Sequence, residues 1–271
     1  MSDPCQKSDA RIVITEMMMN PEIENATSRY EFTVIVPIFN EEEGMLCLEQ
    51  RLADYLPIAA LKTCVLLVND GSTDRSLSLI REICCRHKDF YYISLARNTG
   101  LSGALKAGID VVGSPWLGYI DADLQTLPED FNLLLSDCRD YEMVMGIRAH
   151  RKDTAFKKLQ SRIANSFRRM MTHDDAVDTN CPLKVLRTDC ARRIPFFKGM
   201  HRFLPALVQL QEGRVKQIPV RHFPRVAGES KYHLRNRLVG PLVDCFAFRW
   251  MRSRYIRYRV AEDNLNETAG E

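Results

Sequence analysis

The stretch CVLLVNDGSTDRSLSLIREICCRH (residues 64–87) contains the local signals of a strand, a turn and a helix in direct succession. A continuous apolar run of this kind is typical of a strand that is buried on both faces, as in a parallel sheet. The dipeptide Asp70-Gly71 marks a turn, and Ser72 is a suitable N-cap for the helix that follows. The stretch therefore predicts a βα unit with polar residues at the carboxyl end of its strand.

The same pattern occurs three more times around this stretch. The other predicted strands lie in EFTVIVPIFN (31–40), at the start of FYYISLARNTGLSGALKAGIDVVG (90–113) and in WLGYIDADLQ (116–125). Strands that alternate with helices of this length indicate an α/β fold with a mostly parallel central sheet and helices on both faces. Because ligands bind outside the carboxyl ends of such strands, we expect the four strand ends to share one cleft.

Two acidic residues and an amide follow the fourth strand at alternate positions: Asp121, Asp123 and Gln125. In an extended chain, alternate residues lie on one face, so these side chains converge if the strand persists that far. Oxygen atoms of this kind are the ligands that Mg²⁺ and Mn²⁺ prefer, and these ions are often shared with substrate phosphates. The sequence predicts a divalent metal site; the alternative is a strand end with solvated acids.

The composition is that of a globular protein with one main domain. The chain has 271 residues, of which 45% are hydrophobic, and its nine cysteines include no Cys-x-x-Cys pair. An odd number of cysteines in apolar segments indicates reduced thiols in a cytosolic protein. Neither a signal peptide nor an apolar stretch of about 18 residues is present, so we expect a chain that is neither secreted nor membrane-spanning.

Positive charge is concentrated in the C-terminal quarter. Residues 201–260 carry 13 Lys or Arg and only three acidic residues, although the net charge is +3. This asymmetry predicts an anionic partner, either a phosphorylated ligand, a membrane surface or nucleic acid. Apolar residues at four-residue steps predict an amphipathic helix over 234–260 that lies on a membrane surface, interrupted or started at Gly240-Pro241. The alternative is a helix packed on the domain with a solvated basic side. The apolar series is Leu234, Leu238, Leu242, Phe246 and Trp250.

Seven segments in a specific order give the chain a resemblance to family 2 glycosyltransferases. More narrowly, the chain is similar to the dolichol-phosphate mannose synthase and bacterial polyprenyl-phosphate glycosyltransferase branch over about residues 32–235. The resemblance implies the nucleotide-diphospho-sugar transferase (GT-A) fold, which we place over 31–232. Residues 1–30 are polar and aperiodic apart from RIVIT, so we expect a loosely held N-terminal extension there, and we expect a basic amphipathic helical segment and tail over 233–271. The segments are VIVPIFNEEEG, LLVNDGSTDRS, LARNTGLSGALKAGID, YIDADLQTLPED, VMGIR, DTNCPLKVLR and RVAGESKY.

The resemblance also implies roles for particular residues. The donor is a UDP- or GDP-linked sugar, with Asp70 on the nucleobase and ribose and with the metal ligands Asp121, Asp123 and Gln125 against the diphosphate. We expect catalytic roles for Asp121, Asp123 and Arg202. The other residues expected to bind the donor are Pro37, Glu41, Asn98, Gly100 and Arg148, and those expected to bind the acceptor or a phosphate are Asp178, His201, Arg202, Arg225, Ser230 and Lys231.

The acceptor is expected to be a polyprenyl phosphate at the cytosolic face of a membrane. A sugar hydroxyl needs a general base, whereas a phosphate monoester is already anionic at neutral pH. No Asp or Glu lies between Asp189 and Glu212, but Lys198, His201 and Arg202 are cations that suit an anionic acceptor. A family 2 enzyme that acts on a hydroxyl in polysaccharide or lipopolysaccharide synthesis is the alternative. A nucleotidyltransferase is less favoured because PIFNEEEG is acidic, and a nucleic-acid-binding module leaves the acidic strand ends unexplained.

A second acidic cluster follows at His173-Asp174-Asp175. It is interpreted as a mobile surface loop rather than a second metal site, because polar loops of this kind are common at protein surfaces. Asp178, close by, is expected to face the acceptor, and the alternative for it is a helix or turn cap.

Overall fold

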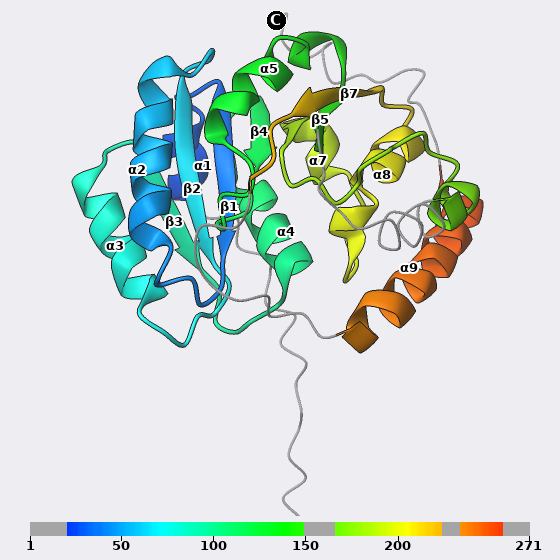
Figure 1. The fold of residues 1–271 in the computed structure, drawn as a ribbon. Helices are drawn as coiled ribbons and strands as arrows, with labels where there is room; N and C mark the ends of the chain where they lie inside the picture. The colour runs from blue at the N-terminus through cyan, green and yellow to red at the C-terminus, as the bar shows by residue number, and fades with distance from the viewer. Residues whose placement is uncertain (1–20, 149–165, 224–233, 257–271) are drawn as a thin grey trace, which may run out of the picture.

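A seven-stranded sheet forms the centre of the computed structural model, which describes residues 21–148, 166–223 and 234–256 (Figure 1). The strand order is β3-β2-β1-β4-β6-β5-β7, and β6 runs antiparallel to both of its neighbours, while the other pairs are parallel. The predicted mostly parallel sheet is therefore confirmed. The strands are β1 (Phe32–Ile38), β2 (Thr63–Asn69), β3 (Phe90–Ser94), β4 (Trp116–Tyr119), β5 (Met143–Arg148), β6 (Lys184–Arg187) and β7 (Val215–Val220).

Helices cover both faces of the sheet because its central strands are apolar on both sides. Along β1, Val34 and Val36 belong to one buried cluster and Ile35 belongs to the other, as expected for side chains that alternate between faces. The first cluster includes residues of α2 (Met45–Tyr55), α3 (Ser76–Arg86) and α5 (Phe131–Leu135). The second includes residues of α4 (Leu101–Val111), α7 (Thr188–Arg192), α8 (Leu204–Leu210) and α9 (Leu234–Arg254).

The start of α3 differs from the expectation. The helix begins at Ser76, and its first backbone N–H donates to Asp74 Oδ1 over 2.9 Å. Ser72 is therefore not its N-cap. Instead, Ser72 Oγ accepts a hydrogen bond from the backbone N–H of Asn40, which links the loops after β1 and β2.

The N-terminal segment is more tightly held than expected. Residues 21–27 form helix α1 (Pro21–Thr27), and Thr27 Oγ1 accepts the backbone N–H of Gly113 over 2.8 Å. A Cβ at Gly113 would lie 2.2 Å from the Glu24 carbonyl oxygen, so this close approach requires glycine. The expectation of a loose extension is wrong for this part of residues 1–30, and residues 1–20 lie outside the described residues.

Helix α9 runs without interruption past Gly240-Pro241, so the expected break is wrong. A proline inside a helix removes one backbone hydrogen bond and favours a kink, but α9 continues through it. The helix turns Cys245 and Phe248 toward the domain, where both are buried. In Figure 1, α9 lies on the side of the molecule away from α2 and α3. Within the described ranges, no helix combines the length and the apolar character needed to span a bilayer.

We predict opposite consequences for two leucines of α2. Leu52 is fully buried between this helix and the sheet, whereas Leu46 is 77% exposed. Leu52→Ala should lower the free energy of unfolding by about 2–5 kcal/mol, because it removes packed methyl groups and leaves a cavity. Leu46→Ala, the matched control, should change it by less than about 0.5 kcal/mol. Urea denaturation of both variants measures the difference, and similar losses would contradict the packing of α2 described above.

Candidate active site

The loops after β1 and β2 are joined by hydrogen bonds. The backbone N–H of Thr73 donates to Asn40 Oδ1 over 2.8 Å, and that of Glu41 donates to Ser76 Oγ over 2.9 Å. Asn40 has a φ of 53°, a left-handed conformation that asparagine tolerates better than most residues. The carboxyl ends of these two strands therefore meet, and Glu41 and Pro37 lie at the same edge as the loop after β2.

Asp70 connects the loop after β2 to the start of α4. The side chain is only 2% exposed; its Oδ1 accepts the backbone N–H and the hydroxyl of Thr99 over 2.7 and 2.8 Å, and its Oδ2 accepts the N–H of Gly100 over 2.8 Å. Gly71 has a φ of 66°, and a Cβ there would lie 2.5 Å from the backbone of Arg97. These contacts hold Thr99 and Gly100 beside the Asp70 turn and use both oxygens of its carboxylate, and the expected role of Asp70 on the nucleobase and ribose stays a prediction.

Asp121, Asp123 and Gln125 do not lie on an extended strand. Strand β4 ends at Tyr119, and Leu124 has a φ of 53° within the turn that follows. The expected convergence by strand alternation is therefore wrong. The turn itself orders the three residues, since Asp123 Oδ1 accepts the backbone N–H of Gln125 over 3.3 Å and Asp121 accepts the Tyr119 hydroxyl over 2.5 Å.

The two carboxylates influence each other. Burial raises the pKa of Asp121 to about 6; the Tyr119 hydrogen bond opposes this rise, and the charge of Asp123 adds to it. A desolvated carboxylate next to another is destabilised when both are ionised, and a divalent cation removes that penalty. Among the described residues, no group of three or more His, Cys, Asp and Glu side chains is arranged to hold a metal ion. The carboxylates of Asp121 and Asp123 alone fit a hard cation that takes further oxygen ligands from Gln125 and from a diphosphate.

A buried lysine lies beneath these acids and was missed in the sequence. Lys184 in β6 is 1% exposed, pairs in register with Tyr119, and has its Nζ 5.5 Å from the centre of the Tyr119 ring. Its Nζ also donates to the carbonyl of Cys181. Burial lowers the pKa of Lys184, while the charge of Asp121 opposes this effect. The sequence signal that could have indicated this buried lysine is its place inside the apolar run CPLKVL.

Arg148 and Asp178, which were expected at different parts of the site, form an ion pair. Arg148 Nε and Nη2 donate to the two oxygens of Asp178 over 2.7 Å each, and both side chains are largely buried. A bidentate pair of this kind has a fixed orientation. The Asp178 carboxylate also accepts the backbone N–H of Arg148 at the end of β5. The turn-cap alternative for Asp178 is thus not the main use of its side chain. Arg148, predicted for the donor, and Asp178, predicted for the acceptor, pair with each other, and both roles stay predictions.

His201 is held by the first turn of α4. His201 belongs to the short 3₁₀ helix η4 (Met200–Arg202), and its Nδ1 lies 2.9 Å from Ser102 Oγ, which also accepts the backbone N–H of Gly199 over 3.1 Å. Burial lowers the pKa of His201 to about 3, and the charges of Arg202 and Lys184 act in the same direction. His201 is therefore neutral at physiological pH, and the expectation that it acts as a cation is wrong.

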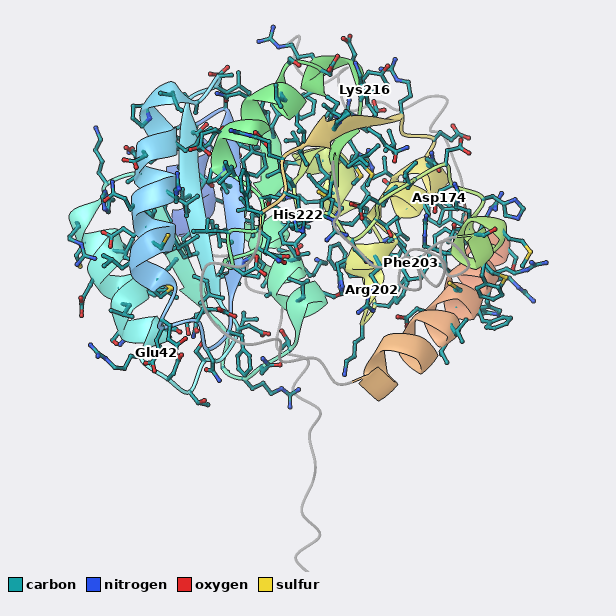
Figure 2. All side chains as sticks on the ribbon, in the orientation of Figure 1. Glu42, Asp174, Arg202, Phe203, Lys216 and His222 are labelled. Carbon is teal, nitrogen blue, oxygen red and sulfur yellow. The ribbon has the colours of Figure 1, made fainter. Side chains whose placement is uncertain are left out.

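Arg202 is the charged member of this segment. Its Nη1 lies 3.9 Å from Asp244 Oδ2 in α9, and Figure 2 shows Arg202 and Phe203 on the side of the molecule where α9 lies. Lys198, the other cation predicted here, is exposed. The expected cationic acceptor side is thus represented by Arg202, together with the buried Lys184 beside the acids.

The chain after β7 passes the turn that holds the acids. The backbone N–H of Phe223 donates to the carbonyl of Gln125 over 2.9 Å, and His222 Nδ1 lies 3.1 Å from the same oxygen (Figure 2). His222 was not predicted, because nothing in the sequence relates it to Gln125. Three predicted phosphate-binding residues, Arg225, Ser230 and Lys231, lie outside the described residues.

The cluster at 173–175 is not a surface loop throughout. Asp174 is buried and accepts hydrogen bonds from Arg168 over 2.6 and 2.7 Å and from Thr172 over 2.6 Å. The expectation of a mobile loop is wrong for Asp174, because its ion pair with Arg168 ties the segment to the preceding helical residues 166–172. His173 and Asp175 are exposed.

The sheet and the polar residues at the carboxyl ends of its strands define the class of this protein. It has the nucleotide-diphospho-sugar transferase (GT-A) fold, with the acids Asp121 and Asp123 at the centre of the site. The family model described as Glycosyl transferase family 2 matches residues 33–197. The chain belongs to this family, as the resemblance implied.

Two relatives are similar in sequence over most of this chain. Dodecaprenyl-phosphate galacturonate synthase of Rhizobium johnstonii is 33% identical over 208 residues, which are 74% of this chain and 62% of that protein. Undecaprenyl-phosphate 4-deoxy-4-formamido-L-arabinose transferase of Yersinia enterocolitica is 30% identical over 217 residues, which are 79% of this chain and 66% of that protein. The matched part of the chain therefore spans less than two thirds of the length of these relatives.

Solved structures share the fold at low sequence identity. Glucosyl-3-phosphoglycerate synthase from Mycobacterium tuberculosis, in complex with Mn²⁺ and uridine-diphosphate-glucose, has a TM-score of 0.58 at 13% identity and covers 88% of this chain and 84% of its own. A mannosyltransferase from Pyrobaculum calidifontis, in complex with GDP-Man and Mn²⁺, has a TM-score of 0.57 at 19% identity and covers 86% and 67%. At such identities the likeness shows the fold alone.

We predict that Asp121→Asn stabilises the metal-free protein above pH 6. Because the pKa of Asp121 is raised from 3.8 to about 6 in the folded state, the folded protein binds more protons, and stability is lost as the pH rises from about 4 to 6. The amide does not titrate, so the variant should gain up to about 3 kcal/mol relative to wild type between pH 4 and pH 8. Thermal unfolding with a chelator measures this difference, and a parallel pH dependence of the two proteins would contradict the described environment.

Proposed function

We propose that this chain is a metal-dependent, inverting glycosyltransferase that moves a sugar from a nucleoside diphosphate to a polyprenyl phosphate at the cytosolic face of a membrane. The observation that carries this proposal is the acidic turn at Asp121 and Asp123, which lies close enough to the buried cations Lys184 and Arg148 for their charges to act on Asp121. Acids that suit a metal and cations that suit phosphates are what a reaction between a diphosphate donor and an anionic acceptor requires.

The donor would lie along the loops after β1, β2 and β3. The turns around Pro37, Glu41 and Asp70 would face the nucleoside, and the Asp70 carboxylate, which accepts the backbone N–H groups of Thr99 and Gly100, would hold the shape of this side of the site. Asp121, Asp123 and Gln125 would hold Mg²⁺ or Mn²⁺, which when bound neutralises the charge of the departing nucleotide. The two solved structures described above bind UDP-linked glucose and GDP-linked mannose with Mn²⁺, which supports a donor of either type.

The acceptor would approach from the side of η4. Arg202 carries the positive charge there, and a neutral His201 can still donate a hydrogen bond to a phosphate oxygen. Both relatives named above are transferases of polyprenyl phosphates by name, which supports a lipid phosphate as acceptor.

A hydroxyl acceptor is the second candidate, and one observation favours it. The sequence has no acid from 190 to 211, but α9 brings the carboxylate of Asp244 beside Arg202, and burial raises the pKa of Asp244 despite the opposing charge of Arg202. A carboxylate with a raised pKa is a suitable general base for a hydroxyl. A phosphate acceptor needs no such base, so the two candidates differ in what the loss of Asp244 does to turnover.

Helix α9 would attach the enzyme to an anionic membrane surface. Its outer side exposes Leu242, Val243, Phe246 and Trp250, which are 46%, 60%, 61% and 68% exposed, while Phe248 on the inner side is buried. A helix with a second, largely exposed apolar side suits burial in a lipid interface. Arg254 is exposed on the same helix, while Arg249 and Arg252 donate to Met171 and Thr172 of the domain. A basic residue near an anionic surface contributes about 1 kcal/mol.

We predict that Asp123→Asn abolishes transfer without unfolding the protein. Incubation of wild type with UDP- and GDP-linked sugars, Mn²⁺ and a short polyprenyl phosphate should give a glycosyl lipid phosphate, detected by its mass. The variant should lose at least about a hundredfold in rate, because one of the two carboxylates that hold the metal becomes a neutral amide.

The control for this experiment is Leu46→Ala, which should keep full activity because its side chain is exposed on α2. Near wild-type turnover of Asp123→Asn at saturating Mn²⁺ would remove the metal assignment. Product formation with a sugar hydroxyl, and none with any polyprenyl phosphate, would favour the second candidate.

We predict that Trp250→Glu weakens binding to vesicles that contain anionic lipid by at least about tenfold. The substitution removes a large apolar side chain from the outer side of α9 and adds a repelled charge. Leu46→Glu, an equally exposed apolar position on α2, is the matched control and should bind as wild type does. Sedimentation with vesicles of increasing anionic lipid content measures both. Equal binding of the two variants would locate the membrane contact elsewhere.

A further inference from the structure

Asp244 reaches from the inner side of α9 to the loop that carries Arg202. Its Oδ2 lies 3.9 Å from Arg202 Nη1, and the two side chains are 19% and 28% exposed. The same oxygen would lie 2.3 Å from a Cβ at Gly199, whose φ is 92°. The carboxylate therefore rests directly against the backbone of this loop, in a place that any side chain at position 199 would fill.

The loop is held by contacts that do not involve Asp244. Phe203 stacks on Phe248 of α9 with ring centres 5.8 Å apart and an interplanar angle of 13°. Ser102 binds both His201 and the backbone of Gly199, and Met200 is fully buried. Because these contacts fix the loop and α9 relative to each other, loss of the Asp244 charge should leave the position of Arg202 unchanged.

The pairing of Asp244 with Arg202 is weak. A separation of 3.9 Å is too long for a hydrogen bond, so the two groups attract each other as charges at a partly exposed place. Burial raises the pKa of Asp244, which means that the ionised carboxylate is poorly solvated where it lies. A phosphate monoester carries more charge and accepts paired hydrogen bonds from a guanidinium, so it competes well for the same arginine.

We propose that Asp244 is the resting counter-ion of Arg202, which the acceptor phosphate displaces, and that Asp244 thereby sets the affinity for the acceptor. This rests on the proposed function, in which Arg202 binds a polyprenyl phosphate. Asp244 is a positioning residue in this scheme and takes no part in the bond that forms. Position 244 lies outside the residues 33–197 that match the family model.

The experiment compares wild type with Asp244→Asn, with farnesyl phosphate as the acceptor in the absence of membrane. Asp244→Asn should lower the KM for farnesyl phosphate about three- to fivefold, because about 1 kcal/mol of competing attraction is removed. The value of kcat and the KM for the nucleotide sugar should stay unchanged. Calorimetric titration with farnesyl phosphate should show the same gain in affinity. Asp244→Ser, which removes the charge with a smaller side chain, should behave in the same way and guards against a folding defect of one variant.

Two further variants make the comparison specific. Asp189→Asn also removes a carboxylate that pairs with an arginine, Arg187, over 2.7 Å, but in α7, directly after the end of β6, and it should change neither kcat nor either KM. In the background of Arg202→Gln, Asp244→Asn should have no effect on acceptor affinity, since the charge with which it competes is gone.

Unchanged or weaker acceptor binding by Asp244→Asn overturns the inference, as does a gain in affinity that persists with Arg202→Gln. A hundredfold fall in kcat with unchanged KM also overturns it, because Asp244 would then act in the transfer step itself. If wild type does not bind farnesyl phosphate at all, the polyprenyl-phosphate function fails first and the inference falls with it, so the two failures are distinguishable.

Discussion

The hydrogen bonds that the buried carboxylate of Asp70 accepts from Thr99 and Gly100 are the interaction on which the rest of the site depends. They fix the start of α4 against the loop after β2. From the first turn of α4, Ser102 then holds the loop of His201. One carboxylate at the end of β2 thus connects the predicted nucleotide side to the predicted acceptor side. A buried acid is tolerated there because three donors satisfy it, two of them backbone N–H groups.

The centre of the site is a balance of buried charges. Asp121 and Asp123 repel each other, while Lys184 and the pair of Arg148 with Asp178 lie close enough to influence them. Charges in such a poorly solvated place are stable only when they are paired. The protein supplies cations on one side of the acids and leaves the other side to a metal and a diphosphate in the proposed function. This arrangement explains why an apolar strand such as β6 contains a lysine.

Helix α9 has two apolar sides with different uses. The inner side carries Phe248, which stacks on Phe203, and Asp244, which faces Arg202, so this side belongs to the domain. The outer side carries Phe246 and Trp250, which are exposed, and in the proposed function this side would contact the membrane. A helix in that position would suit an enzyme whose acceptor has a charged head and an apolar tail. The spacing of apolar residues along the sequence of α9 does not by itself distinguish the inner side of the helix from the outer side.

The βα repeats, the sheet and the polar strand ends could be predicted from the sequence, because these depend on local periodicity and turn chemistry, and the family was indicated by the resemblance of seven segments. The sequence also indicated an acidic centre from Asp121 and Asp123, although a turn and not an extended strand arranges them. Pairings between distant residues were decided only by the tertiary structure: Arg148 with Asp178, Lys184 beside Tyr119, and the neutral state of a histidine that sequence reasoning had treated as a cation. The physical reason is that a side chain's charge and partner depend on burial and on neighbours from other elements, and neither is encoded in the spacing of residues along the chain.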